Sequence, residues 1–372
     1  MDFDLPGDDD PRRLVVRQWL AEHPSPSGRD LAEAGYVAPH WPRPWGLDAD
    51  PIEQIIIDEE LAVAGVHRPP NQIGIGWAGP TLLAAGNEAQ KDRYLFPILS
   101  GEEFWCQLFS EPGAGSDLAS LSTTAVRDGD TYVVNGSKVW TSIAHVSKFG
   151  ILIARTDPDA SKQRGISYFI CPMDAPGVEV RPIVEMTGVH LFNEVFLDEV
   201  RIPAENLVGE ENRGWDLAKV TLANERVSLS TGGVLWGRGP SASDLVTLAR
   251  HHGVADPLLR QRLVQMHIEG ELLRLLRLRT VSAAIKGTQP GPEASIRKVF
   301  ADEHGQRLMA LALDLAGAGA LLAEPGPFGG EQDMWRYGFL FSPALTIGGG
   351  TAEVQRNIIG ERVLGLPAEP QP

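Results

Sequence analysis

The chain has 372 residues, which is enough for two or three domains with a large buried core. Hydrophobic residues make up 43% of it and charged residues 22%, as in an ordinary globular protein. The formal net charge of −16 argues against a nucleic acid or an anionic membrane as the partner, because both attract basic surfaces.

The two cysteines, Cys106 and Cys171, are too few and too scattered for a disulfide framework or a zinc site, so we predict no metal centre. The N-terminus is acidic and lacks the apolar segment of a signal peptide. The most apolar run, residues 308–323, is too short to span a bilayer and contains Asp314. These features predict a cytoplasmic protein without a membrane partner.

Residues 1–105 are predicted to form an N-terminal α-helical domain. One helix starts near Asp50, where the following proline suits a first helical turn. Another spans the glycine-rich segment 71–85, with Gly86 as its stop. Residues 74–79 formally match a dinucleotide-binding fingerprint, but no predicted strand precedes them and no βαβ spacing follows. We interpret their glycines as sites of close helix packing instead.

Residues 106–213 are predicted to form a β domain, in which short antiparallel strands build a barrel or sandwich. Apolar runs separated by Gly, Pro and Asp recur at 131–134, 138–140, 150–154, 166–170, 178–180 and 194–197. Asn135 and Gly136, between the first two runs, predict a hairpin turn, and Asp128 with Gly129 marks another turn.

Residues 214–372 are predicted to form a helical bundle. One long helix covers 258–285 and is ended by Gly287, a second runs over 293–315, and a third starts near Thr351. Long helices joined by short breaks are typical of a four-helix bundle. The predicted fold class is therefore α+β.

Residues 106–117, with the sequence CQLFSEPGAGSD, form the most informative segment of the chain. Gly113 and Gly115 lack Cβ atoms, so the backbone there can approach a polar ligand closely. Ser110 and Ser116 add hydroxyl groups that donate or accept hydrogen bonds. Such a loop suits a flat ligand rich in heteroatoms, although Gly-Ala-Gly-Ser alone is equally consistent with a tight polar turn.

Two further segments could bind the same ligand. Trp140 lies near the end of a predicted strand with Ser142 two positions later, so both side chains are expected on one face of the sheet. An indole can stack on an aromatic cofactor while a hydroxyl bonds its edge, with a core tryptophan beside a surface serine as the alternative. Residues 348–350 are three glycines before a helix led by Thr351, an opening that favours an anion.

The first segment resembles the signature of the acyl-CoA dehydrogenase family, whose core reads Ser/Thr-Glu-Pro-x-x-Gly-Ser-Asp. The predicted order of helices, β domain and helical bundle is also the order in that family, and the resemblance extends over nearly the whole chain. It implies an FAD cofactor, with Trp140 over the flavin ring and Ser142 near the hydride-accepting nitrogen. The family's other flavin contacts correspond to Gln107, Phe109, Ser110, Gly115, Ser116, Thr351 and Glu353.

The chain departs from the family pattern at the catalytic base. Many relatives carry a glutamate immediately before the Gly-Thr pair, and this chain has Gly349 there, which cannot accept a proton. A second family position for the base, a Glu-Arg pair on a helix of the bundle, corresponds to Glu225 and Arg226. We therefore predict Glu225 as the base, with an ordinary exposed carboxylate as the alternative. The resemblance implies substrate contacts from Ser116, Arg226, Gly349 and Gly350.

A second departure concerns the cofactor's diphosphate. The family's Arg-x-x-Phe-Gly motif, which helps to hold that group across a subunit interface, is absent between Gly232 and Gly287. Residues 314–319 match only loosely the family turn that reaches a neighbour's adenine end. We therefore expect a homo- or hetero-oligomer, a dimer or tetramer, in which a sister chain can supply missing groups.

The resemblance implies an acyl-CoA dehydrogenase of fatty acid or sterol side-chain β-oxidation. In that reaction a carboxylate removes the α-proton of an acyl-CoA thioester and the β-hydrogen leaves as hydride to the flavin, giving a trans-2-enoyl-CoA. Electron-transferring flavoprotein would accept the electrons. Two alternatives stay open: a non-catalytic subunit that completes another chain's FAD site, and an oxygen-using acyl-CoA oxidase. Because Gly349 leaves volume beside the thioester site, a branched or polycyclic acyl group is our hypothesis for the substrate.

Overall fold

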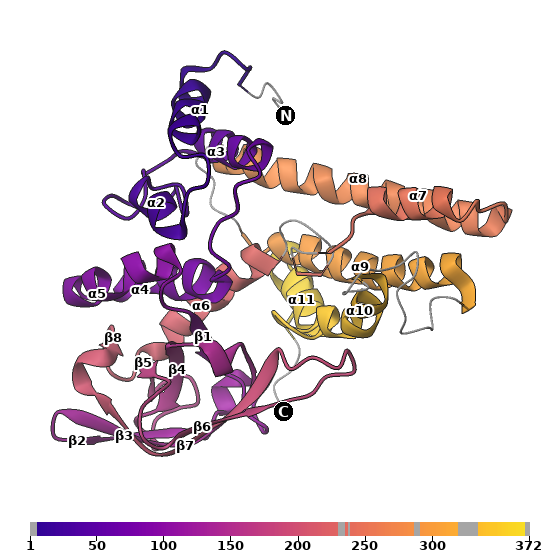
Figure 1. Cartoon of the computed structure of the whole chain (residues 1–372). Helices are drawn as coiled ribbons and strands as arrows, with labels where there is room; N and C mark the ends of the chain where they lie inside the picture. Colours follow the sequence, from indigo (N-terminus) through magenta and orange to yellow (C-terminus); the bar gives the residue numbers. More distant parts are fainter. Residues whose placement is uncertain (1–5, 230–234, 237–238, 286–290, 319–333, 369–372) are drawn as a thin grey trace. The chain divides into compact units, whose positions relative to one another are not determined.

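The computed structural model describes residues 6–229, 235–236, 239–285, 291–318 and 334–368, without the side chains of 226–229 and 281–285. The chain divides into two compact units. Residues 2–185 and 189–224 form the N-terminal unit, and residues 186–188 and 225–372 form the C-terminal unit. Figure 1 draws both, and each is described by itself.

The N-terminal unit begins with helices whose ends follow their sequences. They are α1 (Pro11–Glu22), α2 (Gly28–Glu33), α3 (Pro51–Val63), α4 (Gly79–Ala85) and α5 (Glu88–Ser100), with a π-helical segment at Gly74–Ala78 before α4. Asp50 caps α3 by accepting hydrogen bonds from the N–H groups of Ile52 and Glu53, which confirms the predicted start. A Cβ on Gly79 would lie 2.1 Å from the Trp41 ring, so this glycine allows close packing, as predicted.

An eight-stranded sheet follows in the same unit (Figure 1). Its strands are β1 (Trp105–Leu108), β2 (Thr124–Asp128), β3 (Thr131–Ser142), β4 (Phe149–Arg155), β5 (Ile166–Pro172), β6 (Val178–Pro182), β7 (Phe192–Pro203) and β8 (Leu207–Val208). Their order is β6-β7-β3-β2-β4-β5-β8, with β1 beside β4. Most neighbours pair antiparallel, as predicted, but β1 and β2 run parallel to β4, so the sheet is mixed.

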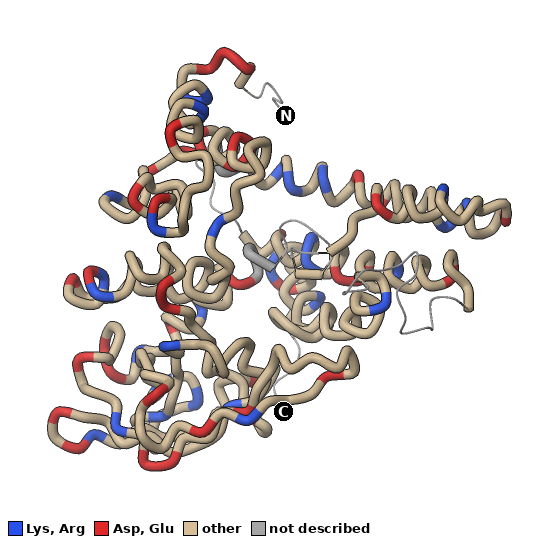
Figure 2. The backbone as a smooth tube through the Cα atoms, viewed as in Figure 1, with Lys and Arg blue, Asp and Glu red and all other residues tan. Residues whose placement is uncertain are grey.

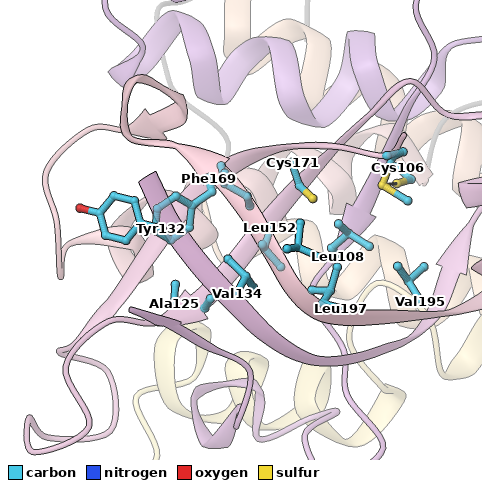
Figure 3. Close-up of a cluster of buried hydrophobic side chains, with 14 of the residues drawn as sticks. Cys106, Leu108, Ala125, Tyr132, Val134, Leu152, Phe169, Cys171, Val195 and Leu197 are labelled. Carbon is cyan, nitrogen blue, oxygen red and sulfur yellow. Dashed lines mark hydrogen bonds between the residues drawn. The ribbon is translucent and has the colours of Figure 1, made fainter. Parts of the chain in front are cut away.

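Buried side chains from six of these strands form the core of the β domain (Figure 3). Tyr132 and Phe169 pack edge to face within it, with ring centroids 4.9 Å apart. Both cysteines are free and belong to this core. Burial raises the pKa of the Cys171 thiol to about 12 and that of Cys106 further, so neither is a reactive thiolate.

The predicted hairpin at Asn135 and Gly136 is wrong. Both residues lie inside β3, which is one continuous strand, and the chain turns before it at Gly129, the second predicted turn. Gly136 has a φ of 156° at a bulge in the pairing of β3 with β7. A Cβ there would lie 2.4 Å from the Thr123 hydroxyl oxygen. The glycine therefore serves a bulge and a close approach, not a turn.

Three buried hydroxyl groups tie the start of α6 (Gly214–Leu229) to the rest of the N-terminal unit. The Thr221 hydroxyl on α6 lies 2.8 Å from that of Thr81 on α4 and 3.0 Å from the Tyr168 hydroxyl on β5. Buried hydroxyls need such partners, because an unpaired polar group in the core is costly. The cluster thus fixes the first turns of α6 against both the helices and the sheet.

The C-terminal unit is helical in the described ranges. It contains the end of α6, then α7 (Ala242–His251), α8 (Pro257–Ile285), α9 (Ala294–Ala316), α10 (Met334–Phe341) and α11 (Ala352–Ile358). Helix α9 packs against α7, α8, α10 and α11, so it is the centre of the bundle. The three predicted helices are confirmed, and α7 and α10 are additions to them. The predicted stop of α8 at Gly287 lies outside the described residues.

Acidic and basic residues are interspersed along both units, as Figure 2 shows. Among the helices that are described, none is both long and apolar enough to cross a membrane. Within the same ranges, no three His, Cys, Asp or Glu side chains gather into a group that could hold a metal ion.

Candidate functional site

Residues 109–123, between β1 and β2, form a loop that we call the exposed loop, and a tight turn closes its first part. Glu111 and Ala114 exchange backbone hydrogen bonds of 3.0 Å in both directions. Neither Gly113 nor Gly115 has a positive φ, and a Cβ on either would meet none of the described atoms within 4 Å. Packing in the described structure therefore does not demand glycine at these positions. The open space beside them fits a ligand that approaches the backbone.

The other predicted flavin contacts of this segment differ in exposure. Gln107 lies on β1 and Ser110 just after it, both partly buried, whereas Ser116 is exposed. Phe109 is only 3% exposed and packs edge-on against Tyr168, with ring centroids 6.0 Å apart. The Phe109 ring therefore supports the loop from inside the core, and Ser116 is the residue that faces outward.

A buried ion pair lies behind this loop. The Nζ atom of Lys138 on β3 is 2.8 Å from Glu111 Oε1, and both side chains are almost completely inaccessible. Burial raises the pKa of Glu111, but the Lys138 charge and donors from Ser122 and Thr123 outweigh it and lower that pKa to about 2. Burial lowers the pKa of Lys138 to about 8 against the opposing charge of Glu111. Both groups are thus predominantly charged at neutral pH.

Among the described aromatic residues of this unit, Trp140 is the exposed one. Its side chain is 59% exposed and its φ is 59°, a left-handed conformation that non-glycine residues rarely adopt. The pairing of β3 with β7 shifts register between Lys138 and Thr141, and this bulge turns the indole outward. Its ring meets Phe192 edge to face at 6.0 Å. Ser142 follows, partly buried, in the resumed pairing, and Thr141 between the two is buried.

The C-terminal unit holds the glycine loop before α11. Gly349 and Gly350 have φ values of 67° and 86°, so both need the conformational freedom of glycine. A Cβ on Gly348 would lie 2.4 Å from the Trp236 ring. The Thr351 hydroxyl accepts from the Val354 N–H at 3.2 Å and caps α11. Glu353 in the first turn is exposed.

A second buried lysine supports this glycine loop. Lys298 on α9 donates from Nζ to the carbonyl oxygens of Leu345 (3.0 Å) and Gly348 (2.7 Å), and it lies 2.6 Å from Asp302. Burial raises the pKa of Asp302 to about 6, although the Lys298 charge opposes that shift. The loop is therefore fixed through its main chain from the centre of the bundle.

Glu225 on α6 is a buried carboxylate. It is 8% exposed, so the alternative of an ordinary exposed glutamate does not hold for it. Arg226 follows on the same helix, and its side chain lies outside the described residues. Trp140 belongs to the N-terminal unit and Glu225 to the C-terminal unit.

Three family profiles match the chain in order. They are the N-terminal domain of acyl-CoA dehydrogenases at residues 12–102, the middle domain at 106–200 and the C-terminal domain at 212–364. The chain belongs to the acyl-CoA dehydrogenase family. Members of this family are FAD-dependent oxidoreductases that act on the CH–CH bond of acyl-CoA thioesters. The predicted family and fold class are thus confirmed.

Known acyl-CoA dehydrogenases resemble this chain closely. FadE34 of Mycobacterium tuberculosis is 44% identical over 91% of this chain, but the match covers only 45% of FadE34. IpdE1 of the same organism is 42% identical over 91% of this chain and 87% of its own. A solved steroid acyl-CoA dehydrogenase, Tcur3481–Tcur3483, is 31% identical with a TM-score of 0.82, covering 99% of this chain and all of its counterpart.

The N-terminal unit of this family member has features that fit the flavin part of FAD. The exposed indole of Trp140 offers an aromatic face that the chain holds outward at the cost of a left-handed backbone. Gly113 and Gly115 leave the neighbouring loop open. Lys138 and Glu111 were not among the predicted site residues. A charged residue at an inward position of an apolar strand was the signal that could have identified Lys138.

Proposed function

We propose that this chain catalyses the α,β-dehydrogenation of an acyl-CoA thioester with Glu225 as the base. The observation that carries the proposal is a buried carboxylate on α6 in a chain whose other family position for the base is Gly349. Glu225 would take the α-proton onto its carboxylate oxygen. Its burial keeps water away from that transfer, which favours proton removal by a fixed group. Arg226 beside it would order the site, because a guanidinium stays charged.

We propose that the exposed loop and the glycine loop hold the cofactor and the thioester. FAD, when bound, supplies the acceptor for the β-hydrogen, which leaves as hydride. Trp140 would cover the flavin, and Ser142 would bond its edge. The remaining cofactor contacts would come from Gln107, Phe109, Ser110, Gly115, Ser116, Thr351 and Glu353. Ser116, Gly349 and Gly350 would also meet the thioester, whose oxygen needs hydrogen-bond donors as negative charge develops on it.

We propose further that the working enzyme contains a companion chain of the same family. The absence of Arg-x-x-Phe-Gly from residues 232–287 leaves the diphosphate without its usual family contact. More than half of FadE34 lies outside its match to this chain, and the steroid acyl-CoA dehydrogenase pairs two components, Tcur3481 and Tcur3483. Apolar side chains also lie exposed along α8, namely Val264, Ile268, Leu272 and Leu275. A second family chain is the occupant that this face suits.

Native mass spectrometry of the enzyme purified from its own cells should show this chain together with a second acyl-CoA dehydrogenase chain and FAD. The chain produced alone should hold less than about a tenth of the flavin, because groups for the diphosphate are missing from it. Co-production of the companion should restore one flavin per site. A homo-oligomer with full flavin content would contradict the proposal of a companion chain, while leaving Glu225 as the candidate base.

For the substrate we propose a CoA thioester with a bulky polycyclic acyl group. Gly349 carries no side chain beside the predicted thioester site, and the similar Tcur3481–Tcur3483 enzyme is a steroid acyl-CoA dehydrogenase. Anaerobic titration of the holoenzyme should bleach the flavin at least about tenfold faster per unit concentration with a steroid acyl-CoA than with butyryl- or octanoyl-CoA. A preference for the straight chains would refute the bulky substrate.

We propose electron-transferring flavoprotein as the electron acceptor, as in the family. The alternative, an oxidase, would pass electrons to oxygen. Admitting air to the bleached enzyme distinguishes them in the same experiment, because an oxidase regains its colour with stoichiometric peroxide.

A further inference from the structure

Lys138 is a fully buried lysine with every donor engaged. Its side chain has no measurable exposure, and its Nζ atom contacts Glu111 Oε1 at 2.8 Å, the Phe109 carbonyl at 3.1 Å and the Ile153 carbonyl at 2.9 Å. Three acceptors match the three N–H groups of an ammonium. Lysine is almost never fully buried unless it is paired in this way. One side chain therefore joins the exposed loop to β4 as well as to its own strand.

Glu111 completes the connection at the other end of the loop. Its Oε2 atom accepts from the Ser122 N–H and hydroxyl, both at 2.7 Å, and its Oε1 atom accepts from the Thr123 N–H at 3.0 Å. The pair therefore binds the chain where it enters the loop, at Phe109, and where it leaves it, at Ser122 and Thr123. The exposed residues between these points are supported from behind, and their outer side stays open.

The same short stretch of β3 also carries the indole. Lys138 precedes Trp140 by two residues, and the Val139 N–H between them donates to the Ser110 carbonyl at 2.9 Å. The bulge that turns Trp140 outward begins immediately after Lys138. The three consecutive residues Lys138, Val139 and Trp140 thus set both the position of the loop and the direction of the indole.

Stability alone is a weak reason for such a pair. A buried ion pair often contributes less to folding than well-packed apolar residues of the same volume would, because both charges lose their hydration. What the pair does provide is a fixed geometry, because its hydrogen bonds hold four main-chain groups in place. Those groups belong to the loop, to its exit and to the neighbouring strand β4.

We propose that Lys138, with Glu111, is a positioning residue that fixes residues 109–117 of the exposed loop against the strand bearing Trp140, so that loop and indole meet the flavin together. This inference rests on the proposed flavin site. It adds to that site a pair that touches neither flavin nor substrate and acts through Phe109, Ser110 and Trp140.

The test is Lys138→Met in the full enzyme, with its companion chain where one is required. Methionine keeps an unbranched side chain, one atom shorter, but provides no donor for the two carbonyls. We expect the dissociation constant for FAD to rise at least about tenfold. We also expect the fluorescence of bound flavin, measured at saturating FAD, to rise at least about twofold, because a displaced indole quenches it less. Far-UV circular dichroism would confirm that the variant is folded.

Lys148→Met is the matched control. Lys148 lies in the same domain and pairs with Asp174, but this pair is at the surface, with side chains 48% and 65% exposed. Its flavin affinity and fluorescence should equal those of the parent. If Lys138→Met lowers the melting temperature but leaves both flavin readouts at parental values, the pair is only structural and the proposal is overturned.

Two further variants keep the outcome decisive. If Lys138→Met does not fold, Glu111→Gln replaces it, because glutamine keeps the size and one acceptor oxygen while the charge is lost. Glu111→Gln should show the same two flavin changes at smaller size, and parental flavin properties would overturn the inference. Trp140→Ala tests the underlying site: if that variant binds FAD as the parent does, the flavin site itself is misplaced, whatever the lysine variants show.

Discussion

Replacing Glu225 by glutamine should abolish the bleaching of the flavin by acyl-CoA while the enzyme keeps its FAD. Glutamine has nearly the same shape as glutamate but cannot take a proton at neutral pH, so substrate would bind without losing its α-proton. A fixed general base contributes about 10²- to 10⁴-fold to a rate, and we expect a loss of at least about 10³-fold in the bleaching rate. Stopped-flow spectroscopy of the purified holoenzyme under anaerobic conditions measures it.

Asp216→Asn is the control on the same helix. Asp216 is exposed and pairs with Lys219 at 2.8 Å, so the same change from carboxyl to carboxamide should leave the bleaching rate within about twofold. Unchanged bleaching in Glu225→Gln would remove this residue from the mechanism. A parent enzyme that binds FAD but is not bleached by any acyl-CoA would instead favour the non-catalytic subunit.

The sequence was sufficient for the longest helices of the bundle, for α3 and for most strands, because their signals are local. Asp50 before a proline predicts a helix start, and the structure places the cap there. The failure at Asn135 and Gly136 shows where local signals end. That dipeptide favours a turn in isolation, but Thr123 lies against Gly136 and Asn135 bonds Glu199 on β7, so long-range contacts continue the strand through it with a bulge.

The site shows the same division between local and long-range signals. Strict alternation along β3 places Tyr132, Val134 and Lys138 inward, and it would place Trp140 inward as well. The bulge after Lys138 reverses that expectation and exposes the indole. A bulge depends on the pairing with β7, which no spacing within β3 reveals. The family resemblance therefore identified Trp140, and the structure supplies the physical reason for its exposure.

The buried lysines could not be identified as supports from sequence alone. Lys138 and Lys298 each donate to two main-chain carbonyls beside a loop predicted to bind ligand. Their inward positions are readable from strand or helix periodicity, but their acceptors are backbone atoms that are distant in sequence. Every residue has a main-chain carbonyl, so the sequence cannot show which carbonyls accept from these lysines. Only the folded structure shows it.

Replacing Trp140 by alanine should weaken FAD binding without unfolding the chain. An indole buried in a core costs about 3–5 kcal/mol to remove, but Trp140 is 59% exposed and leaves no cavity behind it. We therefore expect the melting temperature to change by no more than about 3 °C, since surface substitutions usually cost less than about 0.5 kcal/mol.

The dissociation constant for FAD should rise at least about tenfold in Trp140→Ala, because stacking on an aromatic ring adds to the apolar area that the ligand covers. Trp140→Phe keeps an aromatic face and should retain most of the affinity. Val126→Ala, which truncates an apolar side chain 64% exposed on β2, should change neither property. Fluorescence titration of the apoprotein with FAD measures all three. Equal affinity in parent and Trp140→Ala would mean that the exposed indole serves another contact, and a large fall in melting temperature would mean that it packs against a surface of the assembled enzyme.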